Sequence, residues 1–377
     1  PPGDEPHDRE SDDDRDERQA RASERCQRLL NAGDPDERAQ DRQRDGEQQH
    51  RHPPVAVHAT GARPTTALTL RIEVPIAGAF VVRDPFEHMD ERTMLGLLAD
   101  RLPHAGDDAA VIDGLVVTID MLHETTDFPS GTTRYTAGWR SVGASLSDLA
   151  AMGAAPTGAV AVYGAPAFEQ EEILAFVDGA RDVCEAVGTE YVGGDLDDHA
   201  EFTVATAAVG RADDPVFRSG AEPGDAVCVT GTLGRSAAAL RYFDRGETGR
   251  ANDLFQFRPR VDAGRALALH ASAMMDSSDG LARSLHQLAE ASDCGMAIET
   301  PLPIDGAVDA VVGPDKRLEL GAFFGEDFEL VCTVPESKLA AAKDASPVTL
   351  TRIGTVVEDG VTLDGQPLPD RGYTHQR

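Results

Sequence analysis

The residues of this chain best suited to chemistry are aspartates that stand in short motifs with glycine, serine or other small residues. In chain order the motifs are Gly106-Asp107-Asp108, Asp120 at the end of an expected strand, Asp148 within an expected helix, Gly193-Gly194-Asp195, Asp276-Ser277-Ser278-Asp279-Gly280 and Gly325-Glu326-Asp327. Carboxylate oxygens are the ligands that Mg²⁺ prefers, and glycine backbone and helix N-termini can approach a phosphate closely. Together the motifs indicate hard-metal chemistry on a nucleotide's phosphates.

Each motif also fits an ordinary structural role when it is taken alone. The acidic turn at 106–108 fits a solvated turn, Gly193-Gly194-Asp195 fits a glycine-rich turn, and Ser278 or Asp279 fits a helix N-cap. Asp148 lies in a small-residue helix with little other polarity, where a buried carboxylate needs a cation or hydrogen bonds to offset its desolvation. The alternative for Asp148 is an exposed position on that helix.

Other metal and phosphate chemistries lack their sequence patterns. The chain has no Gly-x-x-x-x-Gly-Lys-Ser/Thr phosphate-binding loop. Its five cysteines are far apart and include no Cys-x-x-Cys pair, which argues against a zinc site and a disulfide framework. Arg218, in Arg218-Ser219-Gly220, offers a cation for a phosphate. Clustered carboxylates repel one another, and they become favourable neighbours when divalent cations neutralise them.

Helices and strands alternate in the pattern of an α/β or α+β protein with two domains. Apolar periodicity predicts helices at residues 89–102, 137–152 and 169–187 and a further helix that begins at Leu281. Short apolar runs predict strands at 115–119, 191–192, 202–209, 226–230 and 328–334. The polar link at 211–215, followed by Pro223-Gly224-Asp225, is the expected boundary between the domains.

The composition excludes two classes of partner. With 66 acidic and 35 basic residues, the net charge of −31 repels nucleic acid and anionic membranes. No stretch of the chain is long and apolar enough for a membrane span, so we expect a soluble, cytoplasmic protein.

Residues 1–64 are polar and without apolar periodicity, and we expect them, together with the chain as far as residue 88, to be disordered. The pattern of a folded domain begins at Met89, which favours Met89 as the natural start; the alternative is that the upstream segment is a genuine acidic tail.

The acid excess predicts a preference for high salt. Only three of the basic residues are lysines, and the acidic residues are spread along the whole chain, as in a salt-adapted cytoplasmic proteome. Such a chain repels itself until salt screens its charges. We expect the melting temperature to rise as KCl is raised from low to molar concentration. A melting temperature that falls over this range would contradict the interpretation.

The ordered set of motifs resembles the thiamine-monophosphate kinase family. The resemblance runs from about Met89 to Tyr373. Any one motif is shared loosely with a wider superfamily that includes aminoimidazole ribonucleotide synthetase, and the strings Ser-Asp-Leu-Ala-Ala-Met-Gly-Ala and Gly-Glu-Asp-Phe-Glu-Leu favour the kinase. The strings that carry the resemblance are Gly-Asp-Asp at 106–108, Thr118-Ile119-Asp120, 146–154, 193–195, 218–221, 278–281 and 325–327.

The resemblance implies a reaction and an architecture. ATP and thiamine monophosphate would give ADP and thiamine diphosphate by direct in-line transfer with several Mg²⁺ ions. The fold would be the two-domain aminoimidazole ribonucleotide synthetase-like fold. Its N-terminal domain, at 89–210, would pair its sheet with a second copy in a homodimer, and an α/β domain would follow at 217–377. ATP would lie where the two domains meet.

The resemblance also assigns residues to roles. A protein base is not expected, because the attacking phosphate oxygen is already deprotonated at neutral pH, so catalysis rests on positioning and charge neutralisation. The thiamine part would contact Glu326 and Tyr373, and Asp127 stands where the family often has a histidine before phenylalanine. Gly194, Asp195, Arg218 and Ser278 would contact ATP. The implied magnesium residues are Asp108, Thr118, Ile119, Asp120, Asp148, Asp195, Asp276 and Asp279.

Two other functions remain compatible with the sequence. One is an ATP-dependent cyclising enzyme of the aminoimidazole ribonucleotide synthetase type. The other is a non-catalytic module that senses ATP or thiamine phosphates. Intact acids at every implied metal position argue against the sensor, because a protein that only binds a nucleotide needs fewer of them.

Overall fold

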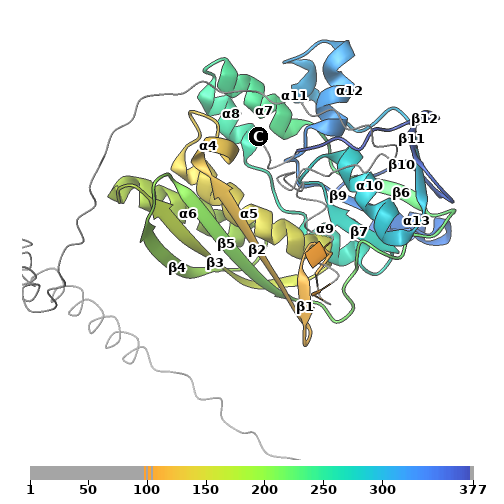
Figure 1. Ribbon diagram of the computed structural model, residues 1–377, viewed down its shortest axis with the longest axis horizontal. Helices are drawn as coiled ribbons and strands as arrows, with labels where there is room; N and C mark the ends of the chain where they lie inside the picture. Colours follow the sequence, from red (N-terminus) through yellow and green to blue (C-terminus); the bar gives the residue numbers. More distant parts are fainter. Residues whose placement is uncertain (1–96, 99–100, 103–104, 374–377) are drawn as a thin grey trace, which may run out of the picture. The chain divides into compact units, whose positions relative to one another are not determined.

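The computed structural model describes residues 97–98, 101–102 and 105–373 (Figure 1). The segment expected to be disordered, the expected start at Met89 and most of the helix expected at 89–102 lie outside the described residues. Two β-sheets organise the described part, with helices packed on them. This arrangement matches the expected α/β class with two domains.

The first sheet has five strands in the order β1-β2-β5-β3-β4. All neighbours pair antiparallel except β3 and β4, which are parallel. The helices α4, α5 and α6 accompany this sheet, and α5 and α6 supply much of its core. The elements are β1 (Ala110–Ile112), β2 (Leu115–His123), α4 (Glu124–Asp127), α5 (Arg134–Ala151), β3 (Ala155–Ala165), α6 (Gln170–Ala186), β4 (Tyr191–Asp198) and β5 (Thr203–Arg211).

One face of this sheet packs on α5 and the other face is apolar and exposed. On β2, Val116 and Thr118 are buried, whereas Ile119 is 78% exposed and Met121 is 55% exposed. Because side chains alternate across a strand, these two pairs lie on opposite faces. The same rows continue across β5 to β3, where two valines are also exposed. We call the surface formed by Ile119, Met121, Val160 and Val162 the open sheet face.

Two strands are longer than the sequence predicts. The strand expected at 115–119 continues to His123, so Asp120 lies inside β2 instead of at its end. The strand expected at 191–192 continues to Asp198, so Gly193-Gly194-Asp195 lies within β4 instead of following a strand. Pairing with β3 extends β4, and Gly194 has a φ of 156° with its Cα so close to β3 that a Cβ would lie 1.7 Å from the carbonyl oxygen of Ala161.

The second sheet has seven strands in the order β12-β11-β8-β10-β6-β9-β7. The interior strand β6 is buried on both faces, which explains its unbroken apolar run. The strands are β6 (Ala226–Thr230), β7 (Ala273–Asp276), β8 (Gly295–Ile298), β9 (Leu330–Val334), β10 (Leu350–Val357), β11 (Val361–Leu363) and β12 (Gln366–Pro367). The helices are α7 (Arg235–Asp244), α8 (Thr248–Phe255), α9 (Val261–Leu267), α10 (Leu281–Ser292), α11 (Gly306–Asp309), α12 (Pro314–Phe323) and α13 (Leu339–Ala345), with a 3-10 turn at Glu336–Lys338.

Helix α5 lies between the first sheet and elements of the second part of the chain (Figure 1). Glycines permit its close packing: a Cβ at Gly138 would lie 2.0 Å from the carbonyl oxygen of Phe176 in α6. A Cβ at Gly264 in α9 would lie 2.0 Å from the carbonyl oxygen of Ala150. Backbones therefore meet α5 on two sides, which holds the helix and its polar side chains in place. Among the described residues no helix is both long and apolar enough to cross a membrane.

Candidate active site

Three aspartates from distant parts of the chain meet at one point. Asp108 lies just before β1, Asp148 lies in α5, and Asp276 is the last residue of β7. Each offers a carboxylate oxygen, and these oxygens lie within 4.8 Å of one another. We call these three residues the aspartate cluster.

Each carboxylate of the aspartate cluster is held by a neighbouring donor. The hydroxyl of Thr118 donates to Oδ2 of Asp148 at 2.5 Å, and the hydroxyl of Ser147 donates to Oδ2 of Asp276 at 2.6 Å. Arg218 donates to both oxygens of Asp108, from Nη2 at 2.8 Å and from Nε at 3.2 Å. Two-point contact of this kind fixes the orientation of a carboxylate.

The electrostatics of the aspartate cluster favour a bound cation. Burial raises the pKa of Asp148 well above its usual value, and the charges of Asp120 and Asp276 raise it further. Burial likewise raises the pKa of Asp276, with Asp108 adding to the effect. A divalent cation would relieve this repulsion, and an all-oxygen set of donors suits Mg²⁺. Beside Asp276, the buried hydroxyl of Ser277 has no hydrogen-bond partner among the described residues, so a further polar group fits there.

Asp120 borders the aspartate cluster without belonging to it. Its Oδ2 accepts a hydrogen bond from the hydroxyl of Ser145 at 2.6 Å, and burial raises its pKa. Thr118 reaches the cluster through its hydroxyl. The side chain of Ile119, in contrast, points to the open sheet face. Ile119 could therefore take the metal-binding role that the sequence resemblance implies only through its backbone.

Gly194 and Asp195 are not brought to the aspartate cluster within one chain. Two strands, β3 and β5, separate β4 from β2, which corresponds to about 14 Å at the usual strand spacing. Asp195 also pairs with Val162, so it lies on the open sheet face, whereas Asp120 faces α5. Both residues instead line a cavity of about 610 Å³ at the edge of the sheet, together with Tyr163 and Tyr191.

The remaining predicted residues of the second part lie on the loop between β7 and α10 and at the C-terminal end. The carbonyl oxygen of Ser278 accepts a hydrogen bond from the backbone N–H of Glu326 at 2.6 Å. The carbonyl oxygen of Asp279 accepts one from the N–H of Tyr373 at 3.0 Å. This loop therefore joins the aspartate cluster, through Asp276, to two residues predicted to bind thiamine.

Asp127, Glu326 and Tyr373, the three predicted substrate residues, lie in one region. The hydroxyl of Tyr373 donates to Oδ1 of Asp127 at 3.3 Å. Burial and the nearby charges of Asp127 and Glu326 raise the pKa of Tyr373 to about 12. Glu326 forms an ion pair with Arg140 of α5, a residue that the sequence interpretation missed. The only signal for Arg140 in the sequence is a charge within a helix of small and apolar residues.

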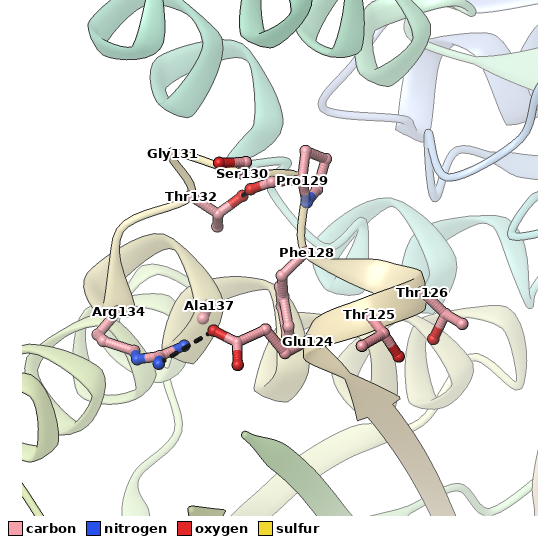
Figure 2. Close-up of a pocket in the computed structure, with 10 residues that line it drawn as sticks. All are labelled: Glu124, Thr125, Thr126, Phe128, Pro129, Ser130, Gly131, Thr132, Arg134 and Ala137. Atoms are coloured by element: carbon pink, nitrogen blue, oxygen red, sulfur yellow. Dashed lines mark hydrogen bonds and ion pairs between the residues drawn. The ribbon is translucent and has the colours of Figure 1, made fainter. Parts of the chain in front are cut away.

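A separate cavity of about 450 Å³ lies beside α4 and the loop that leads to α5 (Figure 2). Hydroxyl groups of Thr125, Thr126 and Thr132 contribute to its lining, and Arg134 forms an ion pair with Glu124 at its edge. None of the site residues predicted from the sequence lines this cavity.

Asp327, next to Glu326, has a structural role that the sequence did not indicate. The structure starts β9 at Leu330 instead of residue 328, because Phe328 has a φ of 53°. Asp327 turns toward the N-terminus of α7, where it accepts hydrogen bonds from the N–H groups of Gly234 at 2.5 Å and Ser236 at 3.0 Å. Burial raises the pKa of Asp327 to about 7.

Two substitutions of Asp327 should distinguish the effect of its hydrogen bonds to the N-terminus of α7 from the effect of its charge. Asp327→Ala leaves the two N–H groups without this acceptor and should lower the free energy of unfolding by about 1 kcal/mol. Asp327→Asn keeps an acceptor. In the folded protein the carboxyl group of Asp327 keeps its proton at pH values above its usual pKa of 3.8. The stability that this bound proton contributes is therefore lost as the pH rises toward about 7. Thermal melts at pH 5 and 8 should show Asp327→Asn gaining stability relative to the wild type as the pH rises. A difference that does not change with pH would contradict this.

Comparisons with known proteins agree with the resemblance seen in the sequence. The family model for the AIR synthase related protein N-terminal domain matches residues 106–212, and that for its C-terminal domain matches residues 222–365. The thiamine-monophosphate kinase of Halobacterium salinarum is 63% identical over 290 residues, which cover 76% of this chain and 100% of that protein. The thiamine-monophosphate kinase of Methanospirillum hungatei is 41% identical over 304 residues, covering 76% of this chain and 99% of its own length. A solved structure of AaThiL complexed with AMPPCP and TMP is similar with a TM-score of 0.70 at 27% identity, covering 79% of this chain and 100% of that one.

Proposed function

Because this chain belongs to the thiamine-monophosphate kinase family, we propose that it transfers the γ-phosphoryl group of ATP to thiamine monophosphate by direct in-line displacement assisted by several Mg²⁺ ions. The observation that carries the proposal is the aspartate cluster, whose three carboxylates crowd together and are each held by a neighbouring donor. A site that only recognised a ligand would not need three mutually repelling acids.

Asp108, Asp148 and Asp276 would hold magnesium directly, with Asp120 and Asp279 nearby for further ions. Bound Mg²⁺ supplies the positive charge that neutralises phosphate oxygens during transfer. Thr118, Ser147 and Arg218 orient the three carboxylates before the substrates arrive, so less reorganisation is needed at the moment of reaction.

The chain would not need a protein base for this reaction. The acceptor is a phosphate monoester, whose second ionisation lies near pH 6, so its attacking oxygen is already free of a proton at neutral pH. What the protein must supply is alignment of two anionic groups at reacting distance. The loop between β7 and α10 is suited to this, since Asp276 at its start belongs to the aspartate cluster and its later residues contact Glu326 and Tyr373.

The region around Asp127, Glu326 and Tyr373 would bind the thiamine part. The thiazolium ring of thiamine carries a positive charge, and two carboxylates beside an aromatic ring offer a complementary surface. Glu326 remains accessible, with 26% of its side chain exposed.

We also propose that the protein works as a homodimer in a salt-rich cytoplasm. The open sheet face is a contiguous apolar surface of the kind that a second copy covers. Asp195 lies on this face, so the roles that the sequence resemblance gives to Gly194 and Asp195 would fall at the boundary between copies.

Met121→Lys should then yield monomers in sedimentation analysis. A variant that sediments as a dimer would contradict the use of this face.

Incubation with ATP, Mg²⁺ and thiamine monophosphate in high salt, followed by separation of the thiamine phosphates, tests the proposed reaction. Thiamine diphosphate and ADP should form in equal amounts. Binding of thiamine monophosphate without the diphosphate product would instead favour a sensor. Turnover of formylglycinamidine ribonucleotide would favour the cyclising enzyme of the superfamily.

A further inference from the structure

Arg140 is a buried cation at the junction of the two parts of the structure. It lies in α5, and only 1% of its surface is exposed. Nη1 donates to the carbonyl oxygen of Phe255 at 2.5 Å, and Nη2 pairs with the carboxylate of Glu326. The guanidinium carbon lies 3.5 Å from the ring centroid of Phe255. A flat, forked cation that stacks on a ring and also grips a carboxylate is a task for arginine rather than lysine.

The partner of Arg140 sits in an unusual backbone segment. Gly325, Glu326 and Phe328 have φ values of 88°, 62° and 53°, in the left-handed region that residues with a side chain rarely adopt. Several contacts hold this segment: the hydroxyl of Ser236 donates to the carbonyl oxygen of Glu326 at 2.6 Å, and the ring of Phe328 stacks on Phe257 at 4.1 Å. Backbone strain that the surroundings maintain is typical of functional sites.

The charges around Glu326 explain why it needs a fixed cation. Asp120 and Asp127 lie close enough for charge interactions with this region, and each is acidic. Without Arg140, repulsion would turn the Glu326 side chain toward solvent. Arg140 also lies two helical turns before Asp148 on α5, so one rigid helix holds both the metal-binding carboxylate and the anchor of Glu326.

We propose that Arg140 is a positioning residue that holds the Glu326 carboxylate in place to receive the cationic ring of the thiamine substrate. The proposal rests on the proposed function, and it adds a determinant of substrate affinity that lies out of reach of the substrate. Arg140 acts through Glu326. Its removal should therefore weaken binding of thiamine monophosphate and leave binding of ATP nearly unchanged.

A double-mutant cycle with Arg140→Met, Glu326→Gln and the combined variant tests this coupling. Each single substitution should raise the KM for thiamine monophosphate by about tenfold and change the KM for ATP by less than about twofold. The double variant should be no worse than Glu326→Gln alone. Arg140→Lys, which keeps the charge without the fork, should fall between wild type and Arg140→Met, and it replaces Arg140→Met in the cycle if that variant does not fold.

Arg134→Met is a matched control in the same helix. Arg134 also stacks on a ring, with its guanidinium carbon 3.9 Å from the centroid of Phe202, and it pairs with Glu172. It also pairs with Glu124 (Figure 2). Its loss should lower the melting temperature without raising the KM for thiamine monophosphate.

Two results would overturn the inference and leave the proposed function intact. One is an unchanged KM for thiamine monophosphate in Arg140→Met. The other is a double variant whose loss equals the product of the two single losses, which would show that Arg140 does not act through Glu326. A wild-type enzyme that neither binds nor phosphorylates thiamine monophosphate would instead overturn the proposed function, and this inference with it.

Discussion

Asp148→Asn is expected to lower kcat by more than about 100-fold while the fold stays intact. An amide is a poor ligand for Mg²⁺, and Asp148 lies at the meeting point of the aspartate cluster. The same substitution removes a partly buried carboxylate that Asp120 and Asp276 repel. In magnesium-free buffer its melting temperature should therefore equal or exceed that of the wild type. Loss of activity combined with gain of stability is the signature of a functional carboxylate, since a structural one would lose both.

Asp178→Asn is the matched control for this variant. Asp178 is also a helical aspartate, but its side chain is 63% exposed and pairs with Arg181 at 3.8 Å. If the effect is specific to the site, Asp178→Asn should keep the steady-state rate of the wild type. Asp148→Asn should lose activity without a lower melting temperature. Full activity in Asp148→Asn would remove Asp148 from the site.

Removal of Mg²⁺ is expected to abolish turnover, and its return should stabilise the protein more at high pH than at low pH. The raised pKa values of Asp148 and Asp276 mean that the metal-free folded protein holds protons that the unfolded chain has already released above about pH 3.8. Stability of the metal-free protein should therefore fall as the pH rises from this value toward neutrality. Mg²⁺ needs the deprotonated carboxylates, so its affinity should rise over the same range.

Thermal melts with and without Mg²⁺ at pH 5 and pH 8 measure this linkage. At one fixed concentration, about 100 times the dissociation constant at pH 8, Mg²⁺ should add about 2.7 kcal/mol to the free energy of unfolding at pH 8. The added stability should be larger at pH 8, and Asp276→Asn should lose most of it. An equal gain at both pH values in the wild type, or an undiminished gain in Asp276→Asn, would contradict the assignment of the aspartate cluster as the magnesium site.

The sequence predicted the class of fold and the two long helices α5 and α6, because these follow from local periodicity, but it did not predict the 11-residue strand β3. The helix expected at 169–187 is α6, and the strand expected at 226–230 is β6 with the same bounds. The ends of β2 and β4 were wrong, because a strand stops where its hydrogen-bonded neighbours stop. The extra residues include Asp120 and His123 in β2 and two glycines in β4, which interrupt the apolar runs, yet β5 and β3 continue to pair with them.

The aspartates suited to metal binding could be named from the sequence, but their convergence could not be derived from it. Asp108, Asp148 and Asp276 meet only because the turn before β1, helix α5 and strand β7 come together in the fold, and no local pattern encodes that contact. Which face of a strand a residue occupies also depends on packing, and so the separation of Asp195 from the aspartate cluster was not visible. The role of Arg140 could not be predicted for the same reason, since its partners Phe255 and Glu326 are more than a hundred residues away in the sequence.

We propose that the aspartate cluster serves phosphoryl transfer from ATP to thiamine monophosphate. The most direct test follows a radioactive γ-phosphoryl group of ATP through a single turnover of the wild-type enzyme and Asp148→Asn with Mg²⁺ in high salt. The wild type should place the label on the terminal phosphate of thiamine diphosphate, with none retained on the protein, and Asp148→Asn should leave it on ATP. Label released as free phosphate without thiamine diphosphate, or equal transfer by both proteins, would contradict the claim.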